Sequence, residues 1–479
     1  MDFTTLIKAY DVRGVVPDPF SEAVARAIGT AFAQCVVLPD HTGDDHPSVV
    51  VGRDMRATGP MLVAAFAAGL RDCGVDVLDM GLTSTDGLYF ASGSRQAHGA
   101  MFTASHNPAE YNGIKLCRPG ARPVGSETGL AEIRAAAEQI LTDGVGTRAT
   151  SVERHGELHA VDLMPEYAQC LRTLVDLSGI RRLKVVVDAG SGMAGHTVPR
   201  VLGDAAGLSA LPLDIVPLYF ELDGSFPFHE ANPLDPKNLV DLQNAVREHE
   251  ADLGLAFDGD ADRCFVVDES GAVVSPSAIT ALVGMREIRS EKAAGRPTPA
   301  IIVNHLTSRA VPAALETAGA RTVRTRVGHS YIKPVMADED AVFGGEHSAH
   351  YYFRDFWFAD SGMLAALHVM AELGGQERPL SELAARYSPY VASGEINRRV
   401  PDAPTVVAAV VEHFQESGPV DVERFDGVTV SSWGEGTRGW WFNLRSSNTE
   451  PLLRLNVEAI DDATMAEVRD RVLEIIDRT

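Results

Sequence analysis

The sequence is poor in cysteine, in long apolar runs and in positive charge. Its five cysteines are scattered over 479 residues without a CxxC pair, so they offer neither a disulfide framework nor a cysteine-rich zinc site. No apolar run approaches the roughly 18 residues that a membrane-spanning helix needs. The first residues also lack the basic and apolar regions of a signal peptide. These absences predict a cytoplasmic protein with reduced thiols and no membrane partner.

Basic residues are outnumbered by acidic ones. Lys and Arg number 42 against 66 Asp and Glu, which gives a formal net charge of −24. Such a chain repels nucleic acid, so no nucleic-acid partner is expected. It also repels an anionic small molecule at long range. An anionic substrate would therefore need a few basic side chains that converge locally, and the informative basic residues are those inside motifs.

The chain does contain a repeated α/β pattern in an ordinary globular composition. Hydrophobic residues make up 45% and charged residues 23%, as in soluble globular domains. Apolar strand-like runs at 49–51, 183–187 and 300–303 each precede small or polar residues and then a helical pattern. This order predicts three similar α/β domains with mixed, mainly parallel sheets. After a glycine-rich break at 374–375 the pattern changes to short strands flanked by helices, which predicts a C-terminal α+β domain.

These patterns predict four domains around a central cleft, in agreement with about 100–200 residues per domain. The predicted boundaries are 1–153 for α/β domain I with a serine loop, 154–254 for α/β domain II, 255–374 for α/β domain III with an acidic loop, and 375–479 for the α+β domain IV.

A serine, a histidine and a lysine meet in one short segment of the first domain. Ala100-Met101-Phe102 predicts a buried strand, and Asn107-Pro108 predicts a turn, because the residue before a proline is pushed out of the helical region. Ser105 and His106 are therefore expected on a tight loop with an exposed hydroxyl, and Lys115 follows after a second turn. These groups can serve as a nucleophile or group carrier, a proton handler and an anion clamp. A turn-stabilising serine is the alternative for the hydroxyl alone.

Three aspartates at alternate positions form a second motif. Asp258, Asp260 and Asp262 lie between two strand-like runs, and carboxylates this close repel one another strongly when unpaired. Ligands with only oxygen donors suit Mg²⁺ or Ca²⁺. An EF-hand is the alternative, because Glu269 falls at its twelfth position. However, Arg263 stands at the sixth position, where the EF-hand turn needs glycine.

The segment from Gly190 to Gly195 satisfies the GxGxxG pattern of dinucleotide-binding turns. The acidic residue expected about 20 residues further on should close the next strand, whereas Asp214 opens the following apolar run. Pro199 also interrupts the helix that the motif should begin. We interpret this segment as a tight structural turn, with nucleotide binding as the less favoured alternative.

The motifs resemble those of the phosphohexomutase family, and most closely the bacterial phosphomannomutases and phosphoglucomutases. Ser105-His106-Asn107-Pro108 with Tyr111-Asn112-Gly113-Ile114-Lys115 resembles the active-site serine loop. Asp258-Gly259-Asp260-Ala261-Asp262-Arg263 resembles the metal loop. The other similar segments, in family order, are Ala9-Tyr10-Asp11-Val12-Arg13-Gly14, Val327-Gly328-His329-Ser330-Tyr331-Ile332-Lys333, Gly344-Gly345-Glu346-His347-Ser348-Ala349-His350 and Arg445-Ser446-Ser447-Asn448-Thr449-Glu450-Pro451.

The resemblance implies a catalytic cycle and the residues that carry it. Ser105, as phosphoserine, exchanges its phosphoryl group with a hexose monophosphate, so that a hexose 1,6-bisphosphate is the intermediate and activator. One Mg²⁺ per chain is held by Ser105 and the three aspartates. The implied catalytic residues are Ser105, His106, Lys115 and Arg263, with Lys115 or His106 handling the hydroxyl proton. The implied substrate-binding residues are Arg13, His329, Lys333, Glu346, Ser348, His350, Arg445, Ser447, Asn448 and Thr449.

One departure from the family pattern lies in the sugar-binding loop. The family usually has Gly-Glu-x-Ser-Gly, and this chain has Ala349 at the last place. His347, at the variable place, is equally compatible with facing solvent.

The implied reaction interconverts hexose 6-phosphate and hexose 1-phosphate, with mannose, glucose or both as the sugar. The chain is expected to act as a monomer or homodimer. A phosphoglucosamine mutase would use the same residues and is the first alternative. A phosphosugar-binding sensor without chemistry is the second, and the intact Ser105 and three aspartates speak against it.

Overall fold

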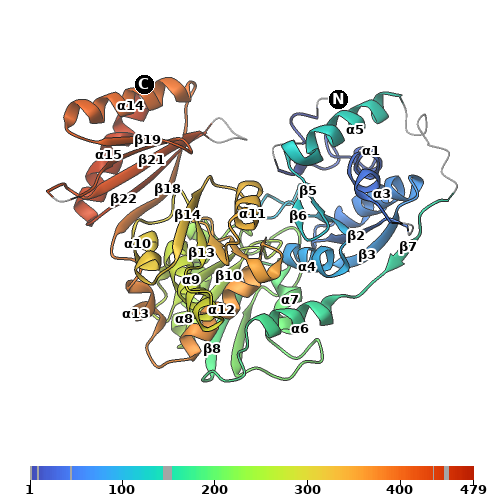
Figure 1. The fold of residues 1–479 in the computed structure, drawn as a ribbon, viewed down its shortest axis with the longest axis horizontal. Helices are drawn as coiled ribbons and strands as arrows, with labels where there is room; N and C mark the ends of the chain where they lie inside the picture. Colours follow the sequence, from blue (N-terminus) through green and yellow to red (C-terminus); the bar gives the residue numbers. More distant parts are fainter. Residues whose placement is uncertain (1–2, 8–9, 44–45, 144–153, 435, 447–451) are drawn as a thin grey trace.

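The computed structural model describes residues 3–7, 10–43, 46–143, 154–434, 436–446 and 452–479. Four β-sheets follow one another along this part of the chain, one of seven strands and three of five. We call these sheets and their helices the first to fourth units. In Figure 1 the first and fourth units lie at opposite ends of the molecule, and the second and third units lie between them. The predicted class, three α/β units followed by an α+β unit, is confirmed.

The first sheet has the order β1-β5-β4-β2-β3-β7, with β6 beside β5. Its strands β4, β2, β3 and β7 run parallel, and β5 pairs antiparallel with β1, β4 and β6. The elements of this unit are β1 (Val12–Val15), α1 (Glu22–Phe32), α2 (Leu38–Asp40), β2 (Ser48–Arg53), α3 (Gly59–Asp72), β3 (Asp76–Leu82), α4 (Thr85–Arg95), β4 (His98–Phe102), β5 (Tyr111–Arg118), β6 (Arg122–Pro123), α5 (Ala131–Asp143) and β7 (Leu158–Ala160).

The valine run of β2 shows why this sheet forms. Successive side chains of a strand point to opposite faces. Accordingly, Val49 and Val51 pack in the cluster that contains α1 and α3, whereas Val50 packs with Leu88 of α4 in another cluster. All three valines are fully buried. A continuous β-branched run of this kind suits a strand covered by helices on both faces.

The second sheet has the order β12-β11-β10-β8-β9. Its unit contains α6 (Met164–Leu174), β8 (Leu183–Asp188), α7 (Ala194–Val201), β9 (Leu213–Leu218), α8 (Val240–Glu248), β10 (Leu253–Phe257), β11 (Cys264–Asp268) and β12 (Val273–Val274). The predicted boundary between residues 254 and 255 falls inside β10. Because β10 pairs with β8 and β11 pairs with β10, the acidic loop belongs to the second sheet and not to the third. The other predicted boundaries remain predictions.

The glycines of the GxGxxG segment permit close backbone packing. A Cβ on Gly192 would lie 2.8 Å from the carbonyl oxygen of Gly259, and one on Gly195 would lie 2.2 Å from that of Phe220. The N–H of Met193 donates to the Gly259 carbonyl at 2.9 Å. The helix that follows has only eight residues. These contacts give the glycines a packing role beside the acidic loop.

The third sheet has the order β14-β13-β15-β16-β17, with parallel pairs around β13 and antiparallel pairs around β16. Its unit contains α9 (Pro276–Ala293), β13 (Ala300–Asn304), α10 (Ala310–Thr317), β14 (Arg321–Thr325), α11 (His329–Asp338), β15 (Phe343–Gly345), β16 (Tyr351–Phe353), β17 (Ala359–Asp360) and α12 (Gly362–Gly374). One buried apolar cluster runs through the second and third units and reaches α4 of the first. These parts of the chain therefore share a core.

The fourth unit is antiparallel, with the order β18-β22-β21-β20-β19. It follows α13 (Leu380–Ala385) and contains β18 (Val391–Arg399), α14 (Ala403–Ser417), β19 (Asp421–Arg424), β20 (Val428–Ser432), β21 (Trp440–Ser446), β22 (Leu452–Ala459) and α15 (Asp462–Arg478). The helices α14 and α15 cover the sheet (Figure 1) and enclose an apolar cluster of their own. The core of the fourth unit is thus separate from the core of the preceding units.

Two expectations from composition can be compared with this structure. The five cysteines are unpaired. Within the described ranges, every helix is too short or too polar to span a lipid bilayer.

Candidate active site

Ser105 lies on a tight loop between β4 and β5. Its φ of 49° is in the left-handed region, which is uncommon for a residue with a side chain. Thr103 supports the turn, because its hydroxyl accepts the N–H of Ser105 at 2.8 Å. The Ser105 hydroxyl donates to Asp258 Oδ2 at 2.7 Å, and the residue is only 5% exposed. The expectation of an exposed hydroxyl is therefore wrong, because the acidic loop of the second unit covers the serine.

A buried guanidinium that the sequence motifs did not indicate holds the serine loop. Arg56 is 1% exposed and pairs with Asp54, which accepts its Nε–H at 3.2 Å. The remaining donors of Arg56 reach backbone carbonyl oxygens of the loop at 2.7 to 2.9 Å, those of Ser105, Asn107, Pro108 and Tyr111. A planar fork of five donors can satisfy several carbonyls at once, which an ammonium cannot do in the same geometry.

We expect Arg56→Met to lower both the stability and the turnover of the protein. It leaves the buried Asp54 and the loop carbonyls without their donor, which costs about 3 kcal/mol, or roughly 6–12 °C in the unfolding temperature of a unit of this size. Differential scanning calorimetry and kcat measure the two effects. Arg53→Met is the matched control, because the hydrogen bond that the Arg53 guanidinium makes in the described part of the chain is long, at 3.4 Å to the Asp54 carbonyl. An unchanged unfolding temperature and an unchanged kcat in Arg56→Met would show that Arg56 does not hold the serine loop in place.

Three carboxylates face the serine from the turn between β10 and β11. Asp258, Asp260 and Asp262 are buried, and each offers an oxygen within 4.8 Å of the others. The flanking elements are strands, so the loop is not an EF-hand. Oδ1 of Asp260 and Oδ1 of Asp262 are buried and have no hydrogen-bond partner in the described part of the chain. Such convergent oxygens could hold a hard metal cation.

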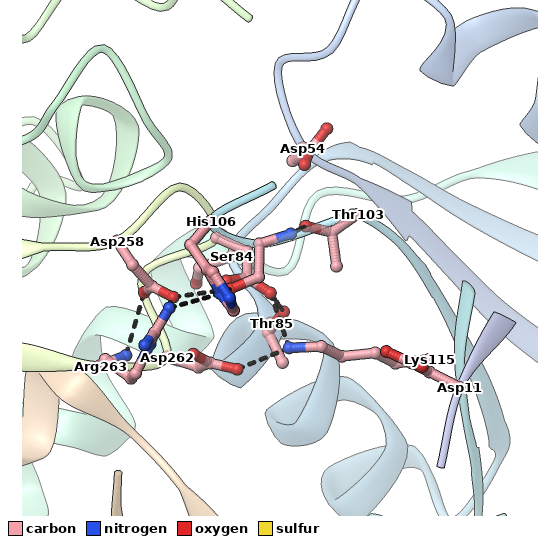
Figure 2. A network of polar contacts seen from close by, with 12 residues as sticks. Asp11, Asp54, Ser84, Thr85, Thr103, His106, Lys115, Asp258, Asp262 and Arg263 are labelled. Carbon is pink, nitrogen blue, oxygen red and sulfur yellow. Dashed lines mark hydrogen bonds and ion pairs between the residues drawn. The ribbon is translucent and has the colours of Figure 1, made fainter. Parts of the chain in front are cut away.

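Two basic side chains compensate part of this negative charge (Figure 2). Lys115 Nζ donates to Asp260 Oδ2 at 2.7 Å and to Asp262 Oδ2 at 2.6 Å. Arg263 Nε donates to Asp258 Oδ2 at 2.8 Å. Three carboxylates and two cations leave a formal charge of about −1 in a buried place, which costs free energy. Burial, only partly offset by Arg263, raises the pKa of Asp258, as expected for a site that lacks one positive charge.

Arg263 also determines which ring nitrogen of His106 carries the proton. Arg263 Nη2 lies 2.7 Å from His106 Nδ1. Since a guanidinium can only donate, Nδ1 is the acceptor and Nε2 carries the proton. Although the residue is partly exposed, desolvation of its ring and the nearby charges of Arg263 and Arg13 hold the pKa of His106 well below its usual range. His106 Nδ1, 3.2 Å from Ser105 Oγ, is therefore neutral and already occupied by Arg263.

Lys115 is held in its charged form. Although burial opposes the charge, Asp260 and Asp262 raise the pKa of Lys115 well above its usual range. Lys115 therefore supplies positive charge here, and a role for Lys115 or His106 in moving the hydroxyl proton remains a prediction.

The predicted sugar-binding loop is a turn between β15 and β16. Glu346 is 2% exposed, and its carboxylate accepts the N–H of Gly328 at 2.9 Å and the hydroxyl of Tyr352 at 2.7 Å. Ser348 Oγ lies 2.9 Å from His350 Nδ1. The carboxylate of Glu346 is thus held by the protein itself, and contacts of Glu346, Ser348 and His350 with a sugar remain predictions.

The departure of this loop from the family pattern has a visible backbone consequence. Ala349 is buried and has a φ of 64°, a left-handed conformation that costs an L-residue about 1–2 kcal/mol relative to the right-handed one. The turn nevertheless closes, because the N–H of Ala349 donates to the Glu346 carbonyl at 3.1 Å. The side chain of His347 does not face solvent. It is 15% exposed and accepts from Asn304 Nδ2 at 2.8 Å through Nδ1.

Arg13 of β1 lies beside the serine loop. Its guanidinium donates to Asn107 Oδ1 at 2.6 Å and to Asp11 Oδ2 at 2.6 Å. These contacts place a cation at the edge of the site, as predicted from the Ala9–Gly14 segment, although its contact with a ligand remains a prediction.

Lys333 of α11 is more buried than its predicted role suggests. It is 3% exposed, its Nζ lies 2.7 Å from Asp360 Oδ1, and the same atom lies 3.7 Å from the ring centroid of Tyr89. Because Tyr89 belongs to α4, these contacts join the third unit to the first. A contact between Lys333 and a substrate would require its ammonium to leave this position.

Arg445 is the residue before the last in β21, and its side chain is 13% exposed. Ser447, Asn448 and Thr449, which follow it in the predicted phosphate-binding loop, lie outside the described residues. The side chain of His329, at the start of α11, also lies outside them. The predicted roles of all five residues in substrate binding remain predictions.

The structure therefore brings all four predicted catalytic residues into one network with the three aspartates (Figure 2). His106, Lys115 and Arg263 lie around the aspartates together with Ser105. His350 of the sugar-binding loop approaches them, with Nε2 at 3.6 Å from Asp262 Oδ1. Thr85, at the start of α4, was missed, although its hydroxyl donates to Asp260 Oδ2 at 2.6 Å. A lone threonine at a helix start carries no sequence signal for such a contact. A hydroxyl among cations and carboxylates that could hold a metal is suited to carry and transfer an anionic group.

Comparisons with known proteins agree with this chemistry. Four family models match in order: phosphoglucomutase/phosphomannomutase alpha/beta/alpha domain I at residues 4–143, domain II at 165–271, domain III at 276–390 and the C-terminal domain at 395–475. The match to domain II ends at residue 271, after the acidic loop, which agrees with the pairing of β8, β10 and β11 in the second sheet.

Individual relatives match over nearly the full chain. A phosphomannomutase of Vibrio cholerae is 38% identical, with 98% of this chain and 97% of that protein covered. A protein of Xanthomonas campestris named phosphohexose mutases is 40% identical, with 96% of each chain covered. A crystal structure of a phosphoglucomutase/phosphomannomutase family protein from Burkholderia thailandensis has a TM-score of 0.83 at 30% identity and covers 99% of this chain and 98% of that one.

Proposed function

Since the chain belongs to the phosphoglucomutase/phosphomannomutase family, we propose that it interconverts hexose 6-phosphate and hexose 1-phosphate, with Ser105 as the carrier of the transferred phosphoryl group. The observation that carries this assignment is the position of the Ser105 hydroxyl, 2.7 Å from Asp258 and beside the Lys115 and Arg263 cations. A hydroxyl in that environment can hold a phosphoryl group whose negative charge is balanced on several sides.

The cycle transfers one phosphoryl group out and another back. A free hydroxyl of the hexose monophosphate attacks the phosphorus of phosphoserine. The bond from phosphorus to Ser105 Oγ breaks, a bond to the sugar oxygen forms, the sugar hydroxyl loses its proton, and Ser105 Oγ gains one. The hexose 1,6-bisphosphate then turns over, and Ser105 Oγ gives up its proton and takes the other phosphoryl group while the sugar oxygen regains a proton. No phosphate is consumed, so the net reaction is an isomerisation.

Positive charge is the main catalytic contribution of the chain. Phosphoryl transfer passes through a loose transition state with charge on the phosphoryl oxygens, so catalysis is chiefly positioning and charge stabilisation. Lys115 and Arg263 are placed to supply that charge. Mg²⁺ would be held by Asp258, Asp260, Asp262 and the phosphorylated Ser105, and when bound it adds positive charge beside the phosphoryl oxygens.

The substrate must be recognised in two orientations, because either phosphate can be the one that does not react. We assign the pocket for the non-reacting phosphate to Arg445 with the loop that follows it, and the clamp for the sugar hydroxyls to Glu346 and Ser348. Arg445 stands on the fourth unit, whose core is separate from that of the other units. A unit of this kind can move as a lid toward the serine loop.

Arg445→Ala is expected to weaken the binding of both monophosphates alike, by about 1.5–3 kcal/mol for a charge-assisted contact. Calorimetric titration of hexose 1-phosphate and hexose 6-phosphate into the Ser105→Ala protein measures each affinity without turnover. Arg438→Ala is the control, since Arg438 belongs to the same unit and pairs with the exposed Glu467. If the affinity for only one of the two monophosphates fell, a shared pocket would be the wrong assignment.

The activity itself is tested with purified protein, Mg²⁺ and a trace of hexose 1,6-bisphosphate. We expect isomerisation of mannose 1-phosphate, glucose 1-phosphate or both, and intact mass spectrometry should show one phosphate that phosphatase removes. Turnover of glucosamine 1-phosphate in preference to either would favour the phosphoglucosamine mutase alternative. Tight binding of these sugars without any turnover would overturn the proposal in favour of a sensor.

We extend the proposal to the setting of the reaction. The protein is proposed to act in the reducing cytoplasm, which agrees with its five unpaired cysteines, and to work as a monomer or homodimer on small hexose phosphates.

A further inference from the structure

Asp86, in the first turn of α4, is a buried carboxylate that the proposed cycle does not use. Its side-chain hydrogen bonds in the described ranges all come from hydroxyl groups. Ser84 Oγ donates to Oδ1, while Tyr167 Oη and Ser361 Oγ donate to Oδ2 at 2.8 and 2.6 Å. Tyr167 belongs to α6 of the second unit, and Ser361 is the N-cap of α12 in the third unit. One carboxylate of the first unit is therefore bonded to both of the units that follow it.

Both serines cap a helix, which determines the direction of their hydrogen bonds. Ser84 Oγ accepts the N–H of Gly87 at 3.2 Å, and Ser361 Oγ accepts the N–H of Leu364 at 3.0 Å. Each hydroxyl carries one proton, and that proton is directed to Asp86. Asp86 therefore accepts hydrogen bonds at both of its oxygens. An ionised carboxylate can do this, whereas an amide can accept only through its single oxygen.

The start of α4 contacts the acidic loop, and Figure 2 shows Ser84 and Thr85 in the network around it. The N–H of Thr85 donates to the Asp260 carbonyl at 3.0 Å, and its hydroxyl donates to Asp260 Oδ2 at 2.6 Å. The hydroxyl bond orients a carboxylate whose other oxygen, Oδ1, is buried and has no hydrogen-bond partner in the described part of the chain. Thr85 directly precedes Asp86, so the anchoring of Asp86 also limits where the Thr85 hydroxyl can lie.

The start of α12 packs on the same loop. Gly362 follows Ser361 and lies against the loop backbone. A Cβ on Gly362 would lie 2.7 Å from the carbonyl oxygen of Arg263 and 3.0 Å from that of Ala261. Asp86 thus bonds the N-cap residues of two helices whose first turns both contact the acidic loop.

We propose that Asp86 is a positioning residue of the mutase, which holds Thr85 in place so that Asp260 keeps the orientation that binds the cation. This inference rests on the proposed function and adds to it a residue that touches neither substrate nor metal. Loss of a group that holds a metal ligand in place typically costs roughly 10–100-fold in metal affinity or activity. Site geometry must be kept within about 0.5 Å, so a small displacement of Thr85 is sufficient to impair the site.

A carboxylate that only stabilises the packing of the three units would give a different result. Its removal would lower the unfolding temperature, but the protein that stays folded would bind Mg²⁺ with unchanged affinity. If Asp86 acts through Thr85, its removal weakens Mg²⁺ binding only while the Thr85 hydroxyl is present. The effects of two side chains that act through one contact are not additive, so a double variant distinguishes the two roles.

The dissociation constant of Mg²⁺ is measured without substrate by calorimetric titration, on proteins whose phosphorylation state is matched by intact mass. The titration is run above neutral pH, where Asp86 is ionised, because burial raises the pKa of Asp86 to about 6. We expect Asp86→Asn and Thr85→Val each to raise the dissociation constant about tenfold. The double variant should also raise it about tenfold, and not about a hundredfold. The mutase assay should show the same increase in the Mg²⁺ concentration that gives half-maximal turnover.

Asp268→Asn is the matched control. Asp268, at the end of β11, is also a buried carboxylate that accepts a serine hydroxyl, but it does so within its own turn, from Ser270 at 2.6 Å. This variant should leave the dissociation constant of Mg²⁺ unchanged.

Unchanged Mg²⁺ affinity in Asp86→Asn would overturn the inference, and so would a double variant in which the two effects multiply. If Asp86→Asn does not fold, Tyr167→Phe removes one hydroxyl donor of Asp86 and keeps the shape of the core. It should still raise the dissociation constant several-fold, whereas an unchanged value would count against the inference. The turnover of the unsubstituted protein is read separately. An inactive unsubstituted protein would reject the proposed function, while an active one with normal Mg²⁺ binding in Asp86→Asn rejects only this inference.

Discussion

Replacing Ser105 with alanine should reduce mutase turnover by at least about 10⁴-fold, the scale seen when a covalent nucleophile is removed. Without Oγ no phosphoryl group can be carried between the two ends of the sugar, and no other hydroxyl of the described chain is placed between Asp258 and Arg263 in the same way. The measurement is kcat with glucose 1-phosphate, together with intact mass, which should show no phosphate on the variant.

The fold should survive this substitution. The lost hydrogen bond to Asp258 costs about 1–3 kcal/mol, and alanine meets the same backbone cost as serine at a φ of 49°. Ser191→Ala is the matched control, because Ser191 is also a buried serine with a left-handed φ, 56°, but belongs to the glycine turn of the second unit. It should keep its activity. Residual turnover above a trace in Ser105→Ala, with host mutases absent from the preparation, would show that the phosphoserine mechanism is wrong.

Removal of divalent cations should abolish the activity, and Mg²⁺ should restore it. The three aspartates, Lys115 and Arg263 leave a formal charge of about −1 around Ser105, and phosphorylation adds about −1.5 to −2 more. A buried site with that excess is unstable unless a cation enters it. Oδ1 of Asp260 and Oδ1 of Asp262 are buried without a hydrogen-bond partner in the described part of the chain, which suits the same hard cation.

The test for the cation has two readouts. Activity is assayed after exhaustive chelation and after readdition of Mg²⁺, and the unfolding temperature is measured with and without Mg²⁺, because a ligand that binds only the folded state stabilises it. Asp260→Asn should lose both responses to Mg²⁺. Asp214→Asn, an exposed carboxylate on the same sheet, should keep both. Full activity after chelation would assign the aspartates to some other role.

Local sequence patterns were sufficient for the class of fold and for the residues that the structure brings together around Ser105. Valine runs such as 49–51 predict buried strands, and the turns after them place polar residues at strand ends. Ser105 and the aspartates of 258–262 could be recognised because each motif lies within a few residues and its chemistry depends on spacing. The family matches confirm the resemblance that these motifs suggested.

Contacts between residues that are far apart in the sequence could not be recognised from local patterns. Arg56 is buried because it meets carbonyls of the loop around 105–111, and nothing within its own segment indicates that contact. The exposure of Ser105 was predicted wrongly because its cover comes from another unit. The predicted boundary after residue 254 differs from the sheet pairing for a similar reason. A strand in isolation does not reveal its neighbour, and β10 pairs with β8 about seventy residues earlier, which puts the acidic loop in the second unit.

Lys333 and His347 illustrate a further limit. An isolated lysine or histidine in a polar segment is compatible with solvent, with a ligand or with an internal partner. Here the ammonium of Lys333 rests against Tyr89 of the first unit, and His347 lies between Asn304 and Glu395. Both contacts join different units, so they depend on how the units pack and not on the residues nearby in sequence.

The separate apolar cluster of the fourth unit affects how the energetics of this protein must be described. A part of a chain with its own buried cluster can melt while the rest stays native, so a single equilibrium between one folded and one unfolded population is not a sound description. A ligand held partly by Arg445 and partly by the serine loop would make the two melting events cooperative. Substrate would then raise the lower of the two melting temperatures and bring it closer to the higher one. The protein would therefore unfold in a single transition only when substrate is bound.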